Sequence, residues 1–377
     1  MATIPQPKKH DEAAKKQHLI PRCYVKPWYI GSSESVWAYN KKEKYHSGVN
    51  SEWDIERRNI ERILQINGFH DIKAGSLCMP EDAEHEIFDD ILQFDVTCNG
   101  KKLKTALEWS LAYSDFNQWI IKDTNGVTFT PDEKAALKEY LDNTRWVYIE
   151  TEWSKAYENQ WHDFINQIES QAKALSFGKR QIGKTPQDIS QDEFKKLIKY
   201  SVVFDWRSLE GNEIFNEIQE VFYRLMPLGT INIPEGERIH KEDKTAEDEI
   251  RHNLILQAFT RYLQNDSGWM KTIETFCVSN CSLSIWLTDL NHPFITSDNP
   301  SFSEKKSDGK QRNYFVALPT MLISYESGNP NEYTINCAAP DQVLDLNKKI
   351  AQNGQLLIVQ SDAYNIKCLF NIKQIKE

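Results

Sequence analysis

Long apolar runs are missing from this sequence, and cysteine is scarce. No apolar run approaches the roughly 20 residues that a helix needs to cross a bilayer, so the pattern predicts no membrane partner. The chain has 7 cysteines in 377 residues, and no signal peptide precedes them. An odd number of scattered cysteines argues against a disulfide-stapled secreted protein and favours reduced thiols in the cytoplasm.

Positive charge is also in short supply. The chain carries 45 Lys and Arg against 55 Asp and Glu, a net charge of −10. Such a chain repels a phosphate backbone at long range, so nucleic acid could be contacted only through a local basic patch. Hydrophobic residues make up 40% of the chain, with 11 Trp, 15 Tyr and 17 Phe. This is ample material for a packed core, and no internal repeat or low-complexity tract interrupts it.

The order of strand-like and helix-like patterns predicts an α+β fold. Residues 1–16 are polar and are expected to be flexible. In residues 17–50, two aromatic and β-branched runs flank "GSSES", which predicts a β-hairpin. Residues 51–271 are mainly helical in pattern, and residues 272–377 are β-rich. We therefore expect residues 17–377 to form a single unit whose mixed sheet is built from the N- and C-terminal segments.

Capping signals and apolar stripes locate the helices. "SEWDIERRNIERILQ", from Ser51, predicts a first helix. Thr130 and Glu133 form a capping box at the start of a long helix over about residues 131–175. Its apolar stripe recurs at helical spacing: Tyr157, Trp161, Phe164, Ile168, Ala172 and Leu175. Ser190 caps another helix, and "DQVLDLNKKIAQN" predicts one among the C-terminal strands. The strands expected there are FCVSNCSLSIWLT, PFITSDNP, YFVALP, MLISYES, EYTINCA, GQLLIVQSD and KCLFNIK.

"GKRQIGKT", residues 178–185, matches the phosphate-loop pattern G-x-x-x-x-G-K-[ST]. That loop needs a buried strand before it and a helix directly after it. Here a helical pattern precedes Gly178, and Pro186 disfavours helical geometry at Thr185. We therefore interpret the stretch as a basic, flexible connection between helices, and a phosphate-loop ATPase is the least favoured function. Any contact with phosphate would come from a surface patch of three side chains, Lys179, Arg180 and Lys184.

Two stretches near the ends of the chain carry a resemblance. "QHLIPRCYVKPW" matches Q-H-x-x-P-R-x-Y-L through Gln17, His18, Pro21, Arg22 and Tyr24. "HPFITSDNP" matches F-x-x-S-D-N-P through Phe294, Ser297, Asp298, Asn299 and Pro300. With these motifs the chain resembles the family catalogued as domain of unknown function 4238, a set of mostly bacterial proteins of comparable length.

The middle of the chain resembles that family more loosely. Its members carry a helix with repeated Glu, which is matched here by Glu152, Glu158 and Glu169. A later family Arg, usually within Q-x-x-R-[ST], corresponds to Arg207, although Phe204 stands where Gln is expected. The likeness is completed by Leu318, Pro319 and Asn347. The resemblance implies one fold over nearly the whole chain and brings no established activity with it.

Two interpretations of the end motifs are open. Asp298 follows an apolar strand, where it either forms an Asx turn rigidified by Pro300 or serves as a functional carboxylate that the turn preorganises. His18 and Arg22 lie four residues apart. The Arg fork suits phosphate or carboxylate, and His titrates near neutrality. The structural alternative is that Arg22 pairs with a Glu and His18 bonds a buried carbonyl.

The long helix offers a third candidate group. Glu158, His162 and Glu169 fall on one helix face, because residues four and eleven apart nearly align. This spacing could hold a divalent metal, the one cofactor that the pattern indicates, and a solvated helix face explains the same residues. If the resemblance holds, this face converges with Arg207, the His18–Arg22 pair and Asp298 on one pocket.

Carboxylates with a His and two Arg make up a phosphate-ester site, in which a carboxylate or His acts as base and Arg stabilises developing charge. We therefore expect a cytoplasmic hydrolase of phosphodiester or nucleotide substrates, such as a ribonuclease-like toxin or phage-defence effector. The expected catalytic residues are His18, Arg22, Glu158, Glu169, Arg207 and Asp298. The expected substrate-binding residues are Gln17, Ser297, Asn299 and Asn347. The alternative is a non-catalytic binding or sensor module that recognises a phosphate-bearing ligand or a phage protein.

Overall fold

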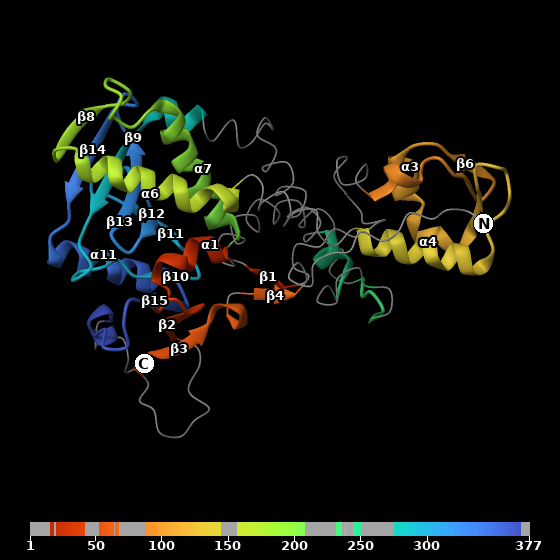
Figure 1. The fold of residues 1–377 in the computed structure, drawn as a ribbon, viewed down its shortest axis with the longest axis horizontal. Coiled ribbons are helices and arrows are strands. Elements are labelled where there is room, and N and C mark those ends of the chain that lie inside the picture. Colours follow the sequence, from red (N-terminus) through yellow and green to blue (C-terminus); the bar gives the residue numbers. More distant parts are fainter. Residues whose placement is uncertain are drawn as a thin grey trace. The chain divides into compact units, whose positions relative to one another are not determined.

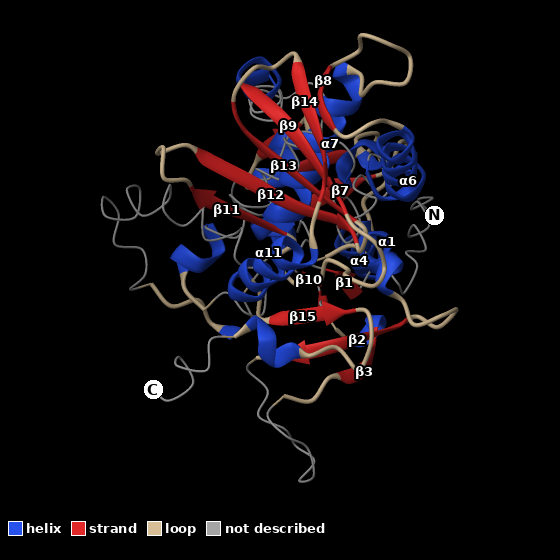
Figure 2. Ribbon diagram, turned by 90° about the vertical axis from the view of Figure 1, so that its left-hand side faces the viewer, coloured by secondary structure: helices blue, strands red, loops and turns tan. Residues whose placement is uncertain are grey.

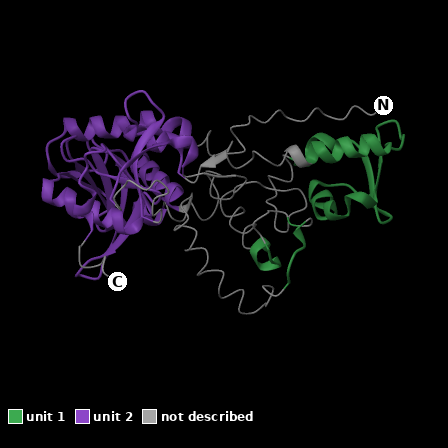
Figure 3. Cartoon of the chain, turned by 90° about the horizontal axis from the view of Figure 1, so that it is seen from below, with its two compact units in different colours: residues 1–17, 66–154, 215–268 green, residues 18–65, 155–214, 269–377 purple. Residues whose placement is uncertain are grey.

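The computed structural model contains two compact units, which are described one at a time (Figure 3). Unit 1 comprises residues 1–17, 66–154 and 215–268, and unit 2 comprises residues 18–65, 155–214 and 269–377. The residues that the structure describes are 16–18, 20–41, 53–63, 65–67, 87–144, 157–207, 231–235, 238, 244–250 and 275–370. The N-terminus that was expected to be flexible lies outside these ranges, apart from Lys16.

The largest sheet belongs to unit 2. Its strand order is β11 (Ser301–Lys305), β12 (Gln311–Leu318), β13 (Met321–Ser327), β9 (Cys281–Leu287), β14 (Glu332–Cys337) and β8 (Gly178–Gln181). Strand β14 runs parallel to β9, and the other neighbours are antiparallel. Strand β9 buries every second residue, whereas β13 buries five residues in succession from Met321. A continuous buried run is typical of a strand that is covered on both faces.

A four-stranded sheet in the same unit joins the two ends of the chain (Figure 2). Its order is β10 (Thr296–Ser297), β15 (Leu356–Val359), β2 (Ser35–Asn40) and β3 (Glu56–Asn59), with all neighbours antiparallel. The predicted α+β fold, with a sheet built from N- and C-terminal segments, is confirmed. Strands β1 (Lys16–His18) and β4 (Gln65–Asn67) form a separate two-stranded sheet.

Three helices of unit 2 bring aromatic rings against the large sheet: α1 (Arg22–Val25), α6 (Asn159–Ala174) and α7 (Gln191–Arg207). Figure 1 shows α6 lying across the sheet. The predicted stripe of α6 is buried from Trp161 to Ala172. Five fully buried rings form one cluster with neighbouring centroids 4.8 to 6.0 Å apart: Tyr24, Trp161, Tyr200, Phe204 and Phe315. Each such pair contributes about 0.5–1.5 kcal/mol beyond its buried area.

Helix α11 (Pro340–Asn353) packs its apolar side against β10 and β11. The capping signal at Ser190 is confirmed, since Ser190 Oγ accepts from Glu193 N and Ser190 N donates to Glu193 Oε2. In the part of the chain that the structure describes, no helix is long and apolar enough to span a bilayer.

Unit 1 holds a small sheet where the sequence predicted a mainly helical region. Strands β6 (Lys101–Leu103), β5 (Asp95–Cys98) and β7 (Trp119–Lys122) pair in that order. The helices around them are η4 (Asp89–Ile91), α3 (Ala106–Leu111), η5 (Tyr113–Gln118) and α4 (Pro131–Thr144). The capping box of α4 is confirmed, because Thr130 N donates to Glu133 Oε2 and Glu133 N donates to Thr130 Oγ1.

The hairpin predicted over residues 17–50 is wrong. Residues Arg22–Val25 form α1 and Lys26–Trp28 form the 3-10 helix η2, while β2 pairs with β15 and β3. Tyr24 and Trp28 are four residues apart, so this helical path buries both, with 0% and 1% exposed. Burial and non-local pairing outweigh the local strand pattern.

Three further expectations are corrected. The helix expected from Ser51 is instead β3, the 3-10 helix η3 (Ile60–Arg62) and β4, because β3 completes the sheet beside β2. The stretch expected to be a flexible linker forms β8, which pairs with β14. The strand expected from Phe276 begins only at Cys281, after a helical turn over residues 275–280. Residues 145–156 of the long predicted helix lie outside the described residues.

The Tyr24 hydroxyl provides a test of this core. It hydrogen-bonds Thr296 Oγ1 and donates to Val316 O, both at 2.6 Å. Tyr24→Phe leaves these buried groups short of a partner, so the free energy of unfolding should fall by about 1–3 kcal/mol in urea denaturation. Tyr29→Phe, at a half-buried ring of the same segment, should cost less because water can replace the hydroxyl. Equal losses in the two variants would contradict this account.

Candidate functional site

The two motifs near the ends of the chain meet inside unit 2. Tyr24 bonds Thr296, and Trp28 Nε1 donates to Phe294 O at 3.3 Å. Strand β10 ends at Ser297, whose Oγ accepts from Asn299 N at 3.1 Å and donates to Asn299 O at 2.7 Å. The turn is therefore closed by the Ser297 side chain, and not by the Asx turn of Asp298 that was one of the two interpretations left open by the sequence.

The Asp298 carboxylate instead reaches the start of β15. Its Oδ1 accepts from Gln355 N at 2.7 Å, while Asp298 N donates to Leu356 O at 3.0 Å. A Cβ on Gly354 would collide with Ser297 and lie 2.8 Å from Asp298 Oδ1. Only glycine at position 354 therefore allows the chain to pass this close to the carboxylate.

Burial raises the pKa of Asp298, and backbone hydrogen bonds from Gln355 and Leu356 together with the charge of Lys41 only partly oppose that rise. The folded state therefore holds this proton more tightly than the unfolded chain does. As the pH rises past the ordinary carboxyl range, ionisation removes part of the stability that the folded state has at low pH. Such a carboxyl is a candidate functional group by its chemistry, although internal packing produces the same effect.

Asn299 is 5% exposed and connects three elements. In the amide orientation that satisfies both of its ends, its nitrogen lies 3.0 Å from Ser301 O and 3.3 Å from Asp205 Oδ1, and its oxygen accepts from Asn353 Nδ2 at 2.8 Å. These partners lie on β11, α7 and α11. Asn299 thus holds two helices against the large sheet.

Asn347, on α11, is 2% exposed and fixes the segment before the SDNP turn. Its Oδ1 accepts from Ile295 N at 3.1 Å, and its Nδ2 donates to Pro293 O at 2.9 Å and to Tyr364 Oη at 3.2 Å. The structure therefore brings four predicted residues together around α11: Ser297, Asp298, Asn299 and Asn347. Their hydrogen-bonding groups are largely committed to neighbours within the fold.

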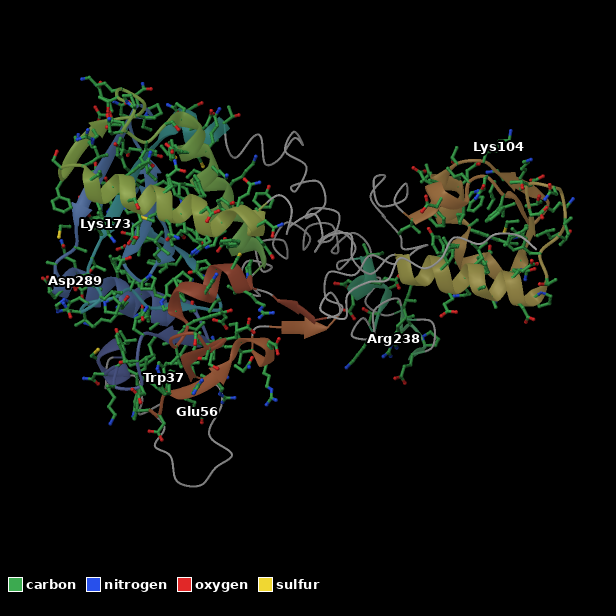
Figure 4. The ribbon with its side chains drawn as sticks, viewed as in Figure 1. Trp37, Glu56, Lys104, Lys173, Arg238 and Asp289 are labelled. Carbon is green, nitrogen blue, oxygen red and sulfur yellow. The ribbon has the colours of Figure 1, made fainter. Side chains whose placement is uncertain are left out.

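The other predicted residues have different partners. Arg22 pairs with Glu34 at 2.6 Å and lies 3.9 Å from Glu61, which is the structural alternative that the sequence allowed. Glu169 accepts from the Thr320 hydroxyl and pairs with Lys173, labelled in Figure 4, at 2.8 Å. The described side chains of Arg22, Glu169 and Asp298 thus share no partner.

Three predicted residues have backbones that the structure describes and side chains that it does not: Gln17, His18 and Arg207. Glu158 is half-buried at the start of α6, and His162, one turn on, is exposed beside Asn166. Among the described residues, no group of three His, Cys, Asp or Glu side chains could hold a metal ion.

The "GKRQIGKT" stretch lines a hollow that the sequence did not predict. The hollow measures about 480 Å³ and is lined by Lys179, Arg180, Gln181, Lys184, Thr185, Asp188 and Glu332. Strand β8 forms one wall at the edge of the large sheet. The chain then turns at Gly183, whose φ of +64° suits glycine. Three cationic side chains therefore share one concave surface.

The buried carboxylate of Asp188 fixes several of the side chains around this hollow through hydrogen bonds. It is 5% exposed and accepts hydrogen bonds from Arg180 Nε, Tyr333 Oη and Thr185 N and Oγ1, at 2.8 to 2.9 Å. Burial raises the pKa of Asp188, but the hydrogen bonds from Arg180, Thr185 and Tyr333 outweigh it and lower the pKa to about 2. Sequence reasoning missed Asp188, although Thr185-x-x-Asp188 has the spacing of a capped turn.

Comparison with known proteins gives a family and no activity. A model of the family described as "Protein of unknown function (DUF4238)" matches residues 16–363, so the chain belongs to that family. No curated protein and no solved structure matches.

Substitutions of Asp298 test whether its carboxylate stabilises the fold through the bond to Gln355 N. Asp298→Ala removes the acceptor for Gln355 N and should lower the free energy of unfolding by about 1–3 kcal/mol in urea denaturation. Asp298→Asn keeps one oxygen to accept that bond and should cost less. Asp345→Ala, at a side chain that is 71% exposed, is the control and should stay within about 0.5 kcal/mol. No loss in Asp298→Ala would show that the Gln355 bond is dispensable.

The contribution of Asp188 to the free energy of unfolding should depend on pH in the acid range. Its folded pKa of about 2 lies below its ordinary 3.8, so its contribution to stability is present above that value and is lost as the pH falls through about 2. The gap in unfolding free energy between wild type and Asp188→Asn should therefore narrow between about pH 4 and about pH 2. Asp192→Asn, at an exposed position nearby, should show a small gap throughout. A gap for Asp188→Asn that stays constant with pH would contradict the assignment.

Proposed function

We propose that this protein binds a phosphate-bearing ligand, a nucleotide or nucleic acid, in the hollow beside β8. The observation that carries the proposal is the gathering of Lys179, Arg180 and Lys184 around one concavity of about 480 Å³. On a chain with a net charge of −10, this is the kind of local basic patch that contact with phosphate requires. A cytoplasmic location, where nucleotides and RNA are available, is part of the proposal.

The three cations are not equivalent. Arg180 is held by Asp188 at 2.8 Å, so its guanidinium is positioned before any ligand arrives. Lys179 is 80% exposed and pairs only distantly with Glu332, at 3.7 Å. Lys184 is exposed and makes no ion pair with any residue that the structure describes. An arriving phosphate would therefore find one fixed donor and two adaptable ammonium groups, which can supply charge-assisted bonds.

Binding without turnover is favoured over hydrolysis at this hollow. Its two carboxylates, Asp188 and Glu332, each pair with a cation, and Asp188 is further saturated by Thr185 and Tyr333. A carboxylate with its pKa lowered to about 2 is a weak base at neutral pH. The hydrolase, toxin or phage-defence role stays a prediction from the sequence, and a protein partner stays part of the same alternative.

Lys184→Ala is the direct test. Isothermal titration with ATP and fluorescence anisotropy with a short single-stranded RNA should show affinity reduced at least about 10-fold, because a hydrogen bond to a charged group contributes about 1.5–3 kcal/mol. The slope of log affinity against log salt should also fall by about 0.7 for RNA, since one fewer phosphate is neutralised. Lys195→Ala, on the surface of α7 outside the hollow, is the matched control and should change neither quantity.

The same samples decide between binding and turnover. Intact RNA and ATP after prolonged incubation with varied divalent metals would support the binding role. Cleavage that is lost in Asp298→Asn but kept in Lys184→Ala would overturn the proposal in favour of the hydrolase that the sequence predicts. Equal affinity of wild type and Lys184→Ala for both probes would remove the hollow from consideration.

A further inference from the structure

An exposed aromatic ring belongs to the segment that leads into the hollow beside β8. The Phe177 side chain is 61% exposed and lies in the connection between α6, which ends at Ala174, and β8, which begins at Gly178. Figure 1 shows β8 beside β14 at the edge of the large sheet. A single exposed apolar ring is common at protein surfaces, so its neighbours decide whether it has a binding role.

The residues on both sides of Phe177 connect it to the hollow. Ser176, the residue before it, accepts a hydrogen bond through Oγ from Arg180 Nη1 at 3.5 Å. Lys179, two residues after it, lines the hollow. Two residues span at most about 7 Å between Cα atoms, so the backbone of Phe177 lies beside the cationic wall. Gly178, with a φ of +114°, makes the bend from Phe177 into β8, a conformation that suits glycine.

The lining of the hollow offers donors to a phosphate and no flat or apolar surface to a base. Of the described residues, seven line it, and none of them is aromatic or aliphatic. They supply three cationic groups and two carboxylates, which leave a net charge of +1. A phosphodiester carries one negative charge, so a backbone phosphate balances this lining. A base attached to that phosphate must find its contact outside the hollow.

A nucleoside triphosphate matches this lining less well than a backbone phosphate does. Its phosphates carry several negative charges, and they usually bind together with Mg²⁺ that protein carboxylates help to hold. Each carboxylate oxygen of Asp188 already accepts two hydrogen bonds, from Arg180 and Tyr333 at Oδ1 and from Thr185 at Oδ2. A ligand whose charge is spread at one per phosphate therefore suits the hollow better than a triphosphate.

We propose that the ligand of the hollow is single-stranded nucleic acid, whose backbone phosphates contact the cationic wall while an adjacent base stacks on the exposed Phe177 ring. The inference rests on the proposed function and names its ligand. A basic groove next to an exposed aromatic side chain is how proteins bind single strands without sequence preference. In a duplex the faces of the bases are covered by their neighbours, so a duplex offers no base to the ring.

A second cavity in unit 2 provides the matched control. It measures about 760 Å³ and lies beside the N-terminal half of α11 and the 3-10 helix η9 (Ile366–Leu369). Among the described residues that line it there is no Lys or Arg, and none of them also lines the hollow beside β8. Leu290, on its wall, is 70% exposed. Leu290→Ala therefore also removes a large exposed apolar side chain, at a surface without cations.

Fluorescence anisotropy of the full chain with three labelled probes is the test. The probes are a short single-stranded RNA, the same RNA as a duplex, and an abasic oligomer with the same number of phosphodiesters as the single strand and no bases. Wild type should bind the single strand about 5-fold or more tighter than the abasic oligomer, the gain from one base–aromatic stack. Phe177→Ala should remove that gain and leave the affinities for the duplex and the abasic oligomer unchanged. Phe177→Trp should retain the gain, and Leu290→Ala should change no affinity.

Lys184→Ala separates the failure of this inference from that of the proposed function. It should weaken binding of all three probes, because each carries phosphates. If Lys184→Ala weakens RNA binding and Phe177→Ala does not, the stacking contact is overturned and the phosphate site stands. Equal losses for the single strand and the abasic oligomer in Phe177→Ala would also overturn the stacking contact. No binding of any probe by wild type, or no effect of Lys184→Ala, would overturn the proposed function and this inference with it.

Discussion

The bond from Gln355 N to the Asp298 carboxylate is the constraint around which unit 2 is arranged. It holds the end of β10 against the start of β15 in the sheet that joins the two ends of the chain. The approach is possible only because residue 354 is glycine, since a Cβ there would collide with Ser297. A half-buried carboxylate is costly unless it is bonded, so pairing of β15 favours the SDNP turn that places Asp298 beside Gln355 N.

The N-terminal motif, QHLIPRCYVKPW, packs against the strand that leads to the SDNP turn. Tyr24 bonds Thr296 at the start of β10, and Trp28 bonds Phe294 just before it. A segment near residue 20 and one near residue 295 are thereby fixed to each other across more than 260 positions of sequence. This contact within the fold gives both segments a structural role that needs no catalysis. The end motifs therefore report the fold first, and any chemistry must be argued from the cavities.

Sequence signals predicted correctly those elements whose structure is determined by interactions between residues close in sequence. The capping boxes at Thr130 and Ser190 and the stripe of α6 formed as expected, because each depends on residues within one or two turns. Segments whose structure depends on distant partners were missed: Arg22–Val25 became helical to bury Tyr24, and Gly178–Gln181 became a strand because β14 offers an open edge. Of the four residues around α11, Ser297, Asp298 and Asn299 were identified from the SDNP motif and Asn347 from the looser part of the resemblance. Residue spacing could not reveal that their hydrogen bonds are mostly internal.

The hollow beside β8 explains why a phosphate-loop pattern can arise without its fold. A true phosphate loop presents backbone N–H groups at a helix N-terminus, whereas here helix α7 begins only at Gln191. The two glycines of the pattern have a different role here, because both adopt a positive φ. Gly178 lies at the start of β8, and Gly183 lies in the turn that follows this edge strand. The feature that this stretch shares with a phosphate loop is its positive charge, carried by Lys179, Arg180 and Lys184. Under the proposed function these cations would attract phosphate by Coulomb interaction, which is weak at an exposed edge and sensitive to salt.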